Sequence, residues 1–554
     1  MADKGMGAAA GGAEGLEPAF LVRWRGSDGW EHECTLAGAA GAWEGRGAAA
    51  LGLSLEQDPD AADNGVRGTA WRLTCQPRDQ VTVVAVEAVL DLDLASCDAL
   101  FLNGYNSWTD SVERPADAAT PTMGPVAYAG VRATTFDGSG DYRFFPQDGR
   151  RGHQHGWGYG YLRYGDRVRL VGSLDEALGQ TALVENYRTG TLTLRKEPPA
   201  RPVAAGEARE LMAFCLLGGT LDRAVEAWLA LAGVTRMPGP ALVGYSSWYR
   251  HYTDISEKCL LHDLVGVSRA LGQHDLGAAQ ATFQVDDGYT KVGDWLAPDA
   301  SKFPHGMAPV AAEIRSRGLL PGIWLAPFLC ERESKLFSEH PSWLLRDEAG
   351  QPVATGGHWS GGVALDTLNP EVRDYVRRSL SAATREWGFR LLKLDFLYAA
   401  CMLAHGGLNR GELMADALDL IWESVPEGTL VDLCGVPIAS ALGRGQYCRI
   451  GCDVGLDWDD QPWMRLMHRE RVSTRNSLAN TRGRAHLDGR AWRNDPDVFF
   501  LRGDVRLTER QRHDLLEADA SLGGVFFTSD DMDAWGPTER AAYATALADF
   551  VGRA

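Results

Sequence analysis

The sequence predicts a multidomain protein that combines all-β and α/β architecture, an N-terminal β-sandwich followed by a (β/α)8 TIM barrel. Its 554 residues exceed the usual range of one domain, roughly 100 to 200 residues. Short runs of β-branched and aromatic residues fill positions 19–218. Beyond residue 235, apolar runs alternate with amphipathic helical patterns. Two folded domains, 19–235 and 236–554, are therefore expected.

Residues 1–18, MADKGMGAAAGGAEGLEP, are predicted to form a disordered tail. This stretch has no apolar h-region, so it does not resemble a signal peptide, and a cytoplasmic location is expected. The chain has no apolar run of roughly 18 residues, so no membrane partner is expected. The formal net charge of −19 argues against nucleic acid as a partner, because phosphate backbones repel an acidic protein. A homo-oligomer is compatible with these observations.

The composition gives no sign of a metal or a disulfide framework. Ten cysteines are scattered along the chain without CxxC pairs, so they are expected to be free, buried thiols. No cofactor is expected. The segments His153-Gln154-His155 and Asp459-Asp460 are interpreted as a surface loop and a helix start.

The first domain is predicted to be a β-sandwich. Its strand-like runs include AFLVRW, TAWRLTC, VTVVAVEAVLDL, ALFLNGY, YRFF, GYGYLRY, RVRLVG, GTLTLRK and LMAFCLL, and turn clusters such as FDGSGD separate them. A helical pattern over 219–233 follows, and Pro238 and Pro240 after it mark the domain boundary.

The second domain contains eight strand candidates separated by helical patterns. They span 241–247, 281–287, 319–328, 389–396, 428–435, 447–453, 497–502 and 523–529. Strands buried on both faces are continuous apolar runs, and eight of them fit a (β/α)8 barrel. A doubly wound open sheet is the alternative, but no Gly-rich phosphate loop follows an early strand. Asp254 with Glu257 resembles a capping box, and Asn369-Pro370 with Gly388 supplies helix start and stop residues.

Polar residues close four of these apolar runs. They are Asp286-Asp287, Lys393 with Asp395, Asp432 to Gly435, and Arg449 to Asp453. A single acid at a strand end is more often a helix cap or an arginine partner. Four such strand ends meet at one mouth of a barrel, where barrel active sites lie, and this convergence favours a functional site.

Two of these carboxyls are predicted to have different environments. The chain has seven lysines against 48 arginines, and Lys393 shares a strand face with Asp395. A neighbouring ammonium group would keep Asp395 ionised, as a nucleophile requires. Asp453 follows a less cationic run, with Arg449 near, and an apolar surround could hold it protonated. Such a pair suits glycoside cleavage, in which one carboxyl attacks carbon and the other donates a proton.

The chain resembles glycoside hydrolase family 36, the α-galactosidases. The resemblance rests on FQVDDGYTKVGDW (283–295), LLKLDF (391–396), LCGVP (433–437), CRIGCDVGLDW (448–458) and AWRNDPD (491–497), with NGYNSWT (103–109) and YSSWY (245–249) in support. It implies a retaining mechanism with Asp395 as nucleophile and Asp453 as general acid/base. It also implies a set of substrate-binding residues, Asp286, Asp287, Trp324, Lys393, Cys434, Arg449, Trp108 and Trp248.

The resemblance implies hydrolysis of terminal α-linked galactose from oligosaccharides or glycoconjugates. Residues near Cys434 bear on the sugar's C2 substituent, so an α-N-acetylgalactosaminidase or a galactosyl-transferring enzyme of the same family is the alternative. After GVFFTSDDM only one helix pattern remains, so the family's C-terminal β domain is expected to be absent or vestigial.

Two other classes of protein were weighed. A metal-dependent barrel hydrolase would use Asp286, Asp287 and Asp453 as ligands, but no histidine lies at a predicted strand end. A non-catalytic sugar-binding protein would not need both Asp395 and Asp453. Trp108 has two interpretations as well, a wall over the sugar site or an anchor between the domains.

Overall fold

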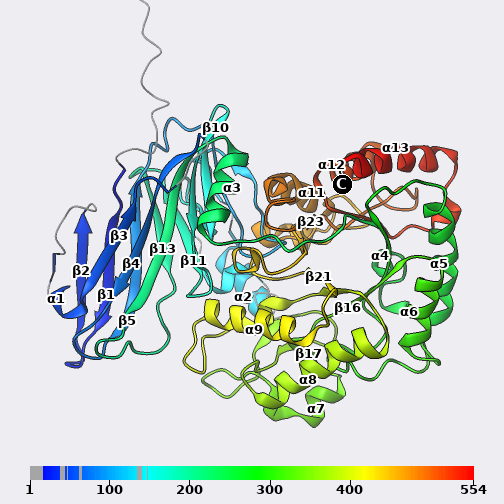
Figure 1. Ribbon diagram of the computed structural model, residues 1–554, viewed down its shortest axis with the longest axis horizontal. Coiled ribbons are helices and arrows are strands. Elements are labelled where there is room, and N and C mark those ends of the chain that lie inside the picture. Colours follow the sequence, from blue (N-terminus) through cyan, green and yellow to red (C-terminus); the bar gives the residue numbers. More distant parts are fainter. Residues whose placement is uncertain are drawn as a thin grey trace, which may run out of the picture.

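The protein has two halves, one built from antiparallel sheets and one from a parallel sheet with helices around it (Figure 1). This computed structural model describes residues 16–37, 44–45, 48–61, 65–120, 122–133, 140–145 and 148–553. Residues 1–15 of the predicted tail lie outside the described residues.

The first half contains two antiparallel sheets. One has the order β2 (Glu31–Ala37), β1 (Ala19–Arg25), β5 (Thr82–Asp91), β12 (Thr191–Lys196), β11 (Thr181–Asn186) and β8 (His155–Trp157). The other has the order β3 (Leu53–Asp58), β4 (Arg67–Cys75), β13 (Arg209–Gly219), β10 (Arg167–Ser173), β9 (Tyr159–Tyr164), β6 (Ala99–Leu102) and β7 (Glu113–Arg114). Side chains from both sheets share one apolar core, in which the rings of Phe20 and Phe214 lie 6.1 Å apart.

Helical segments also occur in this half. They are α1 (Ala48–Leu51), α2 (Pro125–Ala133) and the 3-10 helix Asp141–Arg143. The run YRFF was expected to be strand-like, but the 3-10 helix begins there instead. The helix expected over 219–233 is confirmed as α3 (Leu221–Leu231).

The second half contains a parallel sheet of nine strands that curls through the order of the chain. From one edge the order is β23 (Arg493–Asp495), β22 (Tyr447–Arg449), β21 (Leu430–Leu433), β20 (Leu391–Leu394), β16 (Leu320–Leu325), β15 (Gln280–Val285), β14 (Leu242–Ser246), β25 (Val525–Thr528) and β24 (Val498–Phe499). Only Pro496 and Asp497 separate β23 from β24, so the two edges are joined by one short stretch of chain. This curvature is consistent with the predicted barrel.

One of the eight predicted strands is displaced. The seventh was expected at 497–502, but strand pairing with β22 begins at Arg493 and stops at Asp495. From Val498 the chain pairs with a different strand, β25. Pro496 lies in the interruption, and it has no amide hydrogen to donate to a strand ladder.

Helices surround the parallel sheet (Figure 1). The longer ones are α5 (Glu257–Leu271), α6 (Met307–Ser316), α8 (Pro370–Ser381), α9 (Arg410–Ser424), α11 (Thr474–Gly483), α12 (Glu509–Leu522) and α13 (Pro537–Arg553). Short helices α4 (Trp248–His251), α7 (Lys335–Glu339) and α10 (Pro462–Arg465) lie in loops, and a small sheet is formed by β17 (Leu329–Glu331), β19 (Gly362–Ala364) and β18 (Ala354–Gly356). No helix in the described part of the chain is both long enough and apolar enough to cross a membrane.

Of the two predicted helix starts, the one at Asn369 is confirmed and the one at Asp254 is not. Asn369 caps α8 as predicted, because its side chain accepts a hydrogen bond from the amide of Glu371. The cap predicted at Asp254 is wrong, since Ser256 caps α5 and accepts from the amide of Cys259. A two-residue shift lets Ile255 be buried ahead of the helix.

The interpretation of 153–155 as a surface loop is wrong at His155, and the interpretation of Asp459-Asp460 as a helix start is wrong as well. His155 is buried and its Nε2 lies 2.8 Å from Asp141 Oδ2. Asp459 is buried and pairs with Arg471 and Arg475 instead of capping α10. Asp141 also accepts from Arg469, more than 300 residues away, which local sequence does not indicate.

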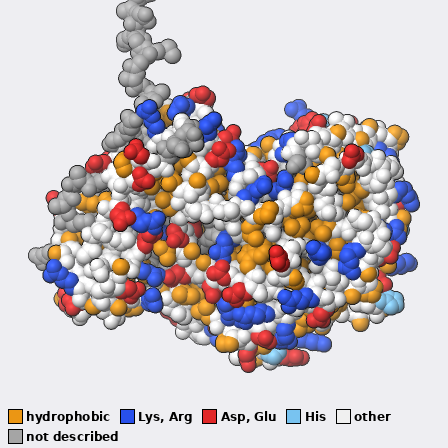
Figure 2. Space-filling view, in the orientation of Figure 1, with side chains coloured by type: hydrophobic (Ala, Val, Ile, Leu, Met, Phe, Trp, Pro, Cys, Tyr) orange, Lys and Arg blue, Asp and Glu red, His pale blue; other side chains and the backbone are white. Residues whose placement is uncertain are grey.

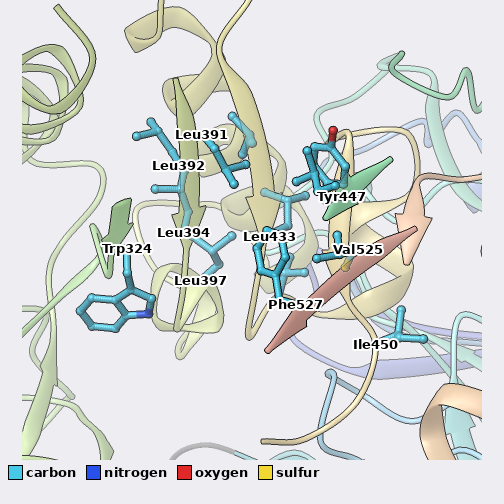
Figure 3. Close-up of a cluster of buried hydrophobic side chains, with 14 of the residues drawn as sticks. Trp324, Leu391, Leu392, Leu394, Leu397, Leu433, Tyr447, Ile450, Val525 and Phe527 are labelled. Atoms are coloured by element: carbon cyan, nitrogen blue, oxygen red, sulfur yellow. The ribbon is translucent and has the colours of Figure 1, made fainter. Parts of the chain in front are cut away.

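The core of the parallel sheet consists of aliphatic and aromatic side chains from neighbouring strands. Figure 3 shows Leu391, Leu392 and Leu394 of β20 close to Leu433 of β21, and all four are almost fully buried. The ten cysteines are free thiols and eight of them are buried, as predicted. Charged side chains of both signs cover the face seen in Figure 2, beside a patch of hydrophobic ones near the junction of the halves.

One face of α11 joins the two halves. Asn476, Asn480 and Arg484 follow each other at intervals of four residues, so they lie on the same side of the helix. The amides of Asn476 and Asn480 donate to the carbonyls of Trp108 and Ser107, at 3.2 Å each. The loop 103–111 from the antiparallel half is thereby fixed onto the parallel half.

Arg484 is the most connected of the three. Its guanidinium donates to Asn103 Oδ1 at 2.9 Å, to the carbonyls of Asn106 and Ser107 at 2.9 and 2.8 Å, and to the carbonyl of Ile450 at 2.7 Å. The side chain is fully buried. It therefore ties loop 103–111 directly to the residue that follows β22. Gly483 makes this approach feasible, because a Cβ there would lie 1.8 Å from the carbonyl oxygen of Ser111.

We expect Arg484→Met to lower the free energy of unfolding by at least about 3 kcal/mol, because several buried carbonyls would lose their donor. Arg482→Met is the matched control: Arg482 is exposed on the same helix, and its loss should change stability by less than about 0.5 kcal/mol. Denaturant unfolding of both variants measures the difference. Equal stability of the two variants would contradict the role given to Arg484.

Candidate active site

A pocket lies at the carboxyl ends of the parallel strands, beside loop 103–111. Its lining includes five of the residues predicted from sequence, Trp108, Asp395, Cys434, Arg449 and Asp453. The remaining lining residues are Ser107, His358, Phe396, Gly451, Trp463, Met464, Met467, Glu470 and Val472. The pocket therefore combines side chains from both halves of the protein.

Asp395 follows β20 and is held by two donors. Trp324 Nε1 donates to its Oδ2 at 3.1 Å, and the amide of Phe396 donates to its Oδ1 at 2.6 Å. Both hydrogen bonds stabilise negative charge on the carboxylate. The ammonium group of Lys393 hydrogen-bonds to Asp286, and the stabilisation of Asp395 expected from Lys393 acts through charge without a hydrogen bond.

The backbone around Asp395 is strained. Phe396 has a φ of +53°, and a non-glycine residue adopts this left-handed conformation only when its surroundings impose it. Gly435, at the end of the neighbouring strand, has a φ of +59°, and a Cβ there would lie 3.1 Å from Asp395 Oδ1. Gly435 thus leaves room for the Asp395 carboxylate, and the strained backbone at Phe396 fixes the direction of that carboxylate.

Asp286 and Lys393 form a buried ion pair. Lys393 Nζ lies 2.9 Å from Asp286 Oδ2, which also accepts from Gln284 Nε2 at 3.0 Å. Burial by itself would lower the pKa of Lys393, but the carboxylate of Asp286 raises it above its usual range. Lys393 therefore stays charged inside the sheet.

Asp287 is buried next to Asp286. Its Oδ2 accepts from Trp359 Nε1 at 2.7 Å, and burial together with the charge of Asp286 raises the pKa of Asp287 to about 7. Asp287 and Trp359 also line a neighbouring cavity of about 430 Å³. This carboxyl is consequently neutral below pH 7 in the ligand-free protein.

Arg449 binds three carboxylates at once. Its Nε donates to Asp495, its Nη1 to Asp453 and its Nη2 to Asp497, at distances of 2.9, 3.0 and 2.9 Å. The side chain of Asp453 is 52% exposed. The expectation that an apolar surround holds Asp453 is therefore wrong, because this carboxyl faces the pocket opening and is paired with a guanidinium.

Asp495 and Asp497 were overlooked as site residues, although AWRNDPD was noted as a motif. Burial alone would raise the pKa of Asp495, but Arg449 holds it below its usual range. Burial, with the charge of Asp453, raises the pKa of Asp497 to about 7 despite Arg449. Asp432 on β21 is also buried, and burial beside Asp495 raises its pKa well above the usual range. The pattern that could have revealed them is a run of acids in a buried strand.

A chain of ring contacts surrounds the pocket. Trp324 contacts Trp359 with ring centroids 6.2 Å apart, and Trp359 contacts Phe396 at 5.1 Å. Tyr398 continues the series and meets the ring of Trp108 edge-on at 5.5 Å. Trp359 and His358, from the loop between β18 and β19, were not predicted, because that loop has no strand-end signal.

Trp248 lies apart from this arrangement. Its ring packs edge-on against Tyr252 at 5.1 Å, and it is not among the described residues that line the pocket. No group of three or more His, Cys, Asp or Glu side chains within the described ranges is placed to hold a metal ion.

Asp395 and Asp453, at strand ends of the curled parallel sheet, share a pocket with a loop from the antiparallel half, and a pair of carboxyls is the arrangement that glycoside hydrolases use. The melibiase family model matches residues 239–403. An α-galactosidase of Escherichia coli is 30% identical over 160 residues, which cover 26% of this chain and 21% of the relative. The resemblance to the α-galactosidases is confirmed, and the match to the melibiase model covers about 30% of the chain.

Solved structures match over most of the chain. An α-galactosidase from Thermus thermophilus, solved in complex with p-nitrophenyl α-D-galactopyranoside, is 28% identical with a TM-score of 0.69, over 90% of this chain and 93% of that one. The same enzyme was solved in complex with stachyose. The family 36 α-galactosidase AgaA from Geobacillus stearothermophilus shares the fold, with a TM-score of 0.59 and 12% identity, over 96% of this chain and 75% of that one. The alignment with the E. coli relative spans about a fifth of that protein's length.

The raised pKa of Asp287 predicts a pH dependence of stability. The native state keeps a proton on Asp287 up to about pH 7, whereas the unfolded chain releases it near pH 4. The free energy of unfolding therefore falls through this group as the pH rises from 4 to 7. In Asp287→Asn this contribution is absent, so the fall between pH 5 and 7 should be shallower than in the wild type. Urea unfolding at both pH values tests this, and an unchanged or steeper slope in the variant would contradict it.

Proposed function

We propose that the protein is a retaining α-galactosidase that hydrolyses terminal α-linked galactose from oligosaccharides or glycoconjugates. The observation that carries the proposal is the pair of carboxyls, Asp395 and Asp453, which line one pocket from the ends of β20 and β22, on either side of β21. The family match and the α-galactosidase relatives support the choice of sugar.

In the first step Asp395 attacks the anomeric carbon and forms a glycosyl ester, while Asp453 protonates the departing oxygen. In the second step Asp453 accepts a proton from water, and the water releases the sugar. Trp324 and the Phe396 amide direct the Asp395 carboxylate. The exposure of Asp453 suits a group that must exchange protons with solvent between the steps.

The galactose hydroxyls are proposed to bind Asp286, Asp287, Lys393 and Arg449. Charged donors and acceptors inside a buried site give stronger hydrogen bonds than neutral ones do. Trp108 and Cys434 would then form walls of the sugar site, since both line the pocket with Asp395. We give Trp248 no place in this site.

The domain assignments predicted from the sequence are part of this proposal. We treat the antiparallel half as the β-sandwich domain, 19–235, and the curled sheet with its helices as the (β/α)8 catalytic domain, 236–554. The cytoplasmic location and the homo-oligomer stay predictions from the sequence.

The two carboxyl roles can be separated by azide rescue. Asp395→Ala should lose turnover of an aryl α-galactoside, and azide should then attack from the opposite face and yield the β-galactosyl azide. Asp453→Ala should still form the glycosyl ester from this activated substrate, so azide should yield the α-galactosyl azide. NMR of the products distinguishes the two anomers.

The same anomer from both variants, or near-normal activity of folded Asp395→Ala, would refute the assignment. Turnover by the wild type in the presence of EDTA distinguishes the proposal from a metal-dependent hydrolase. A panel with an aryl N-acetyl-α-galactosaminide distinguishes it from the family's alternative substrate.

A further inference from the structure

The loop that carries Asp453 also forms the outer wall of the pocket. It connects β22 with α11 over residues 450–473, and it contributes Trp463, Met464, Met467 and Val472 to the lining. These side chains are apolar. The same pocket is lined by Asp395 and Asp453, so a leaving group that departs from these two carboxyls has this wall beside it.

Trp463 is unusually exposed for a residue of its size. Its exposed fraction is 52%, although an indole ring in contact with water is generally covered in part by something. Leu466, three residues later, is 54% exposed but does not line the pocket. Exposure of apolar surface is therefore a property of this loop, and Trp463 is the part that faces the site.

The wall is supported from behind by the antiparallel half. Met467 packs in a buried cluster with Met123 and Tyr142, and Met464 lies against the same cluster. Tyr142 Oη donates to the carbonyl of Met467 at 2.8 Å. The backbone of the wall is thus fixed at Met467.

The wall offers few groups that could hydrogen-bond to sugar hydroxyls. Methionine and valine side chains offer at most a weak sulfur acceptor. Trp463 adds one indole N–H donor. Glu470 also lines the pocket: its Oε1 accepts from Thr109 Oγ1 at 2.9 Å and from the Asp141 amide at 3.3 Å, and its Oε2 is a buried acceptor without a partner among the described residues. Hydroxyls buried against this surface would lose their water partners without replacement, whereas an apolar group would not.

The free space in the pocket is about 80 Å³, far below the roughly 300 Å³ of ordinary small-molecule sites. Asp286 and Lys393 are not among the described residues that line this space, so its volume covers only the part of the proposed site beside Asp395, Asp453 and the wall. Methionine has three rotatable bonds and adapts its shape at low free-energy cost. Met464 and Met467 consequently suit ligands whose outer part varies in shape but is apolar.

We propose that the enzyme is specific for α-galactosides with an apolar, alkyl or aryl aglycone, and that Trp463, Met464 and Met467 form the surface that receives it. This inference rests on the proposed α-galactosidase activity. Contact with the aglycone occurs before its bond is cleaved, so the surface acts on kcat/KM.

Octyl α-galactoside and methyl α-galactoside test the proposal, because their leaving groups have similar basicity and differ in apolar length. With octyl galactoside below its micellar concentration, the wild type should show a kcat/KM at least about tenfold higher for octyl than for methyl. Trp463→Ala should reduce this ratio toward one, because kcat/KM should fall more for the octyl substrate than for the methyl substrate. Trp463→Phe should preserve most of the ratio.

Leu466→Ala is the matched control, because it removes an equally exposed apolar side chain from the same loop outside the pocket. It should leave the ratio unchanged. A wild-type ratio near one, or equal losses on both substrates in Trp463→Ala, would overturn the proposal. Better turnover of melibiose than of octyl galactoside would also overturn the proposal, because it would show that this surface receives a sugar leaving group. Failure of the wild type to hydrolyse methyl and aryl α-galactosides alike would instead overturn the proposed activity, and this inference with it.

Discussion

The hydrogen bonds of Arg484 are the interaction on which the architecture of the site depends. Loop 103–111 and the segment after β22 are more than 300 residues apart in sequence, and one buried guanidinium donates to both. A guanidinium suits this position because it has five donors in a fixed plane and no acceptor. Arg484 has no carboxylate partner among the hydrogen bonds and ion pairs of the described residues, so carbonyl oxygens must satisfy its charge. Trp108 and Asp453 therefore reach the same pocket only when the two halves are docked.

A second constraint is the balance of charge at the strand ends. Asp286, Asp453, Asp495 and Asp497 all face Lys393 or Arg449, and each cation is buried. Two cations cannot keep every nearby acid ionised, and the raised pKa values of Asp287, Asp432 and Asp497 reflect this. Asp395 is different, because its donors are the neutral groups of Trp324 and Phe396. The arrangement leaves the proposed nucleophile free of an ion pair that would compete with its attack.

The strands and the acids at their ends could be predicted, because both depend on residues that are close together in sequence. Continuous apolar runs predicted the strands, and the acids that close them indicated Asp395 and Asp453, which line one pocket. Long-range pairing could not be predicted in the same way. Lys393 hydrogen-bonds to Asp286 and not to Asp395, which is two residues away. Arg449 hydrogen-bonds to Asp495 on β23, more than 40 residues away. The four-residue spacing of Asn476, Asn480 and Arg484 did carry a helix-face signal, but nothing local indicated that a loop from the other half would cover it.

The central claim is that Asp395 forms a covalent bond with the sugar, and trapping that bond tests it most directly. A fluorinated α-galactosyl fluoride destabilises both transition states, but its good leaving group lets the ester form faster than it is hydrolysed. The anomeric fluoride leaves as the ester forms, so peptide mass mapping of the inactivated protein should find one fluorogalactosyl adduct, on the peptide that contains Asp395. An adduct on Asp453, or time-dependent inactivation with no covalent adduct, would contradict the account.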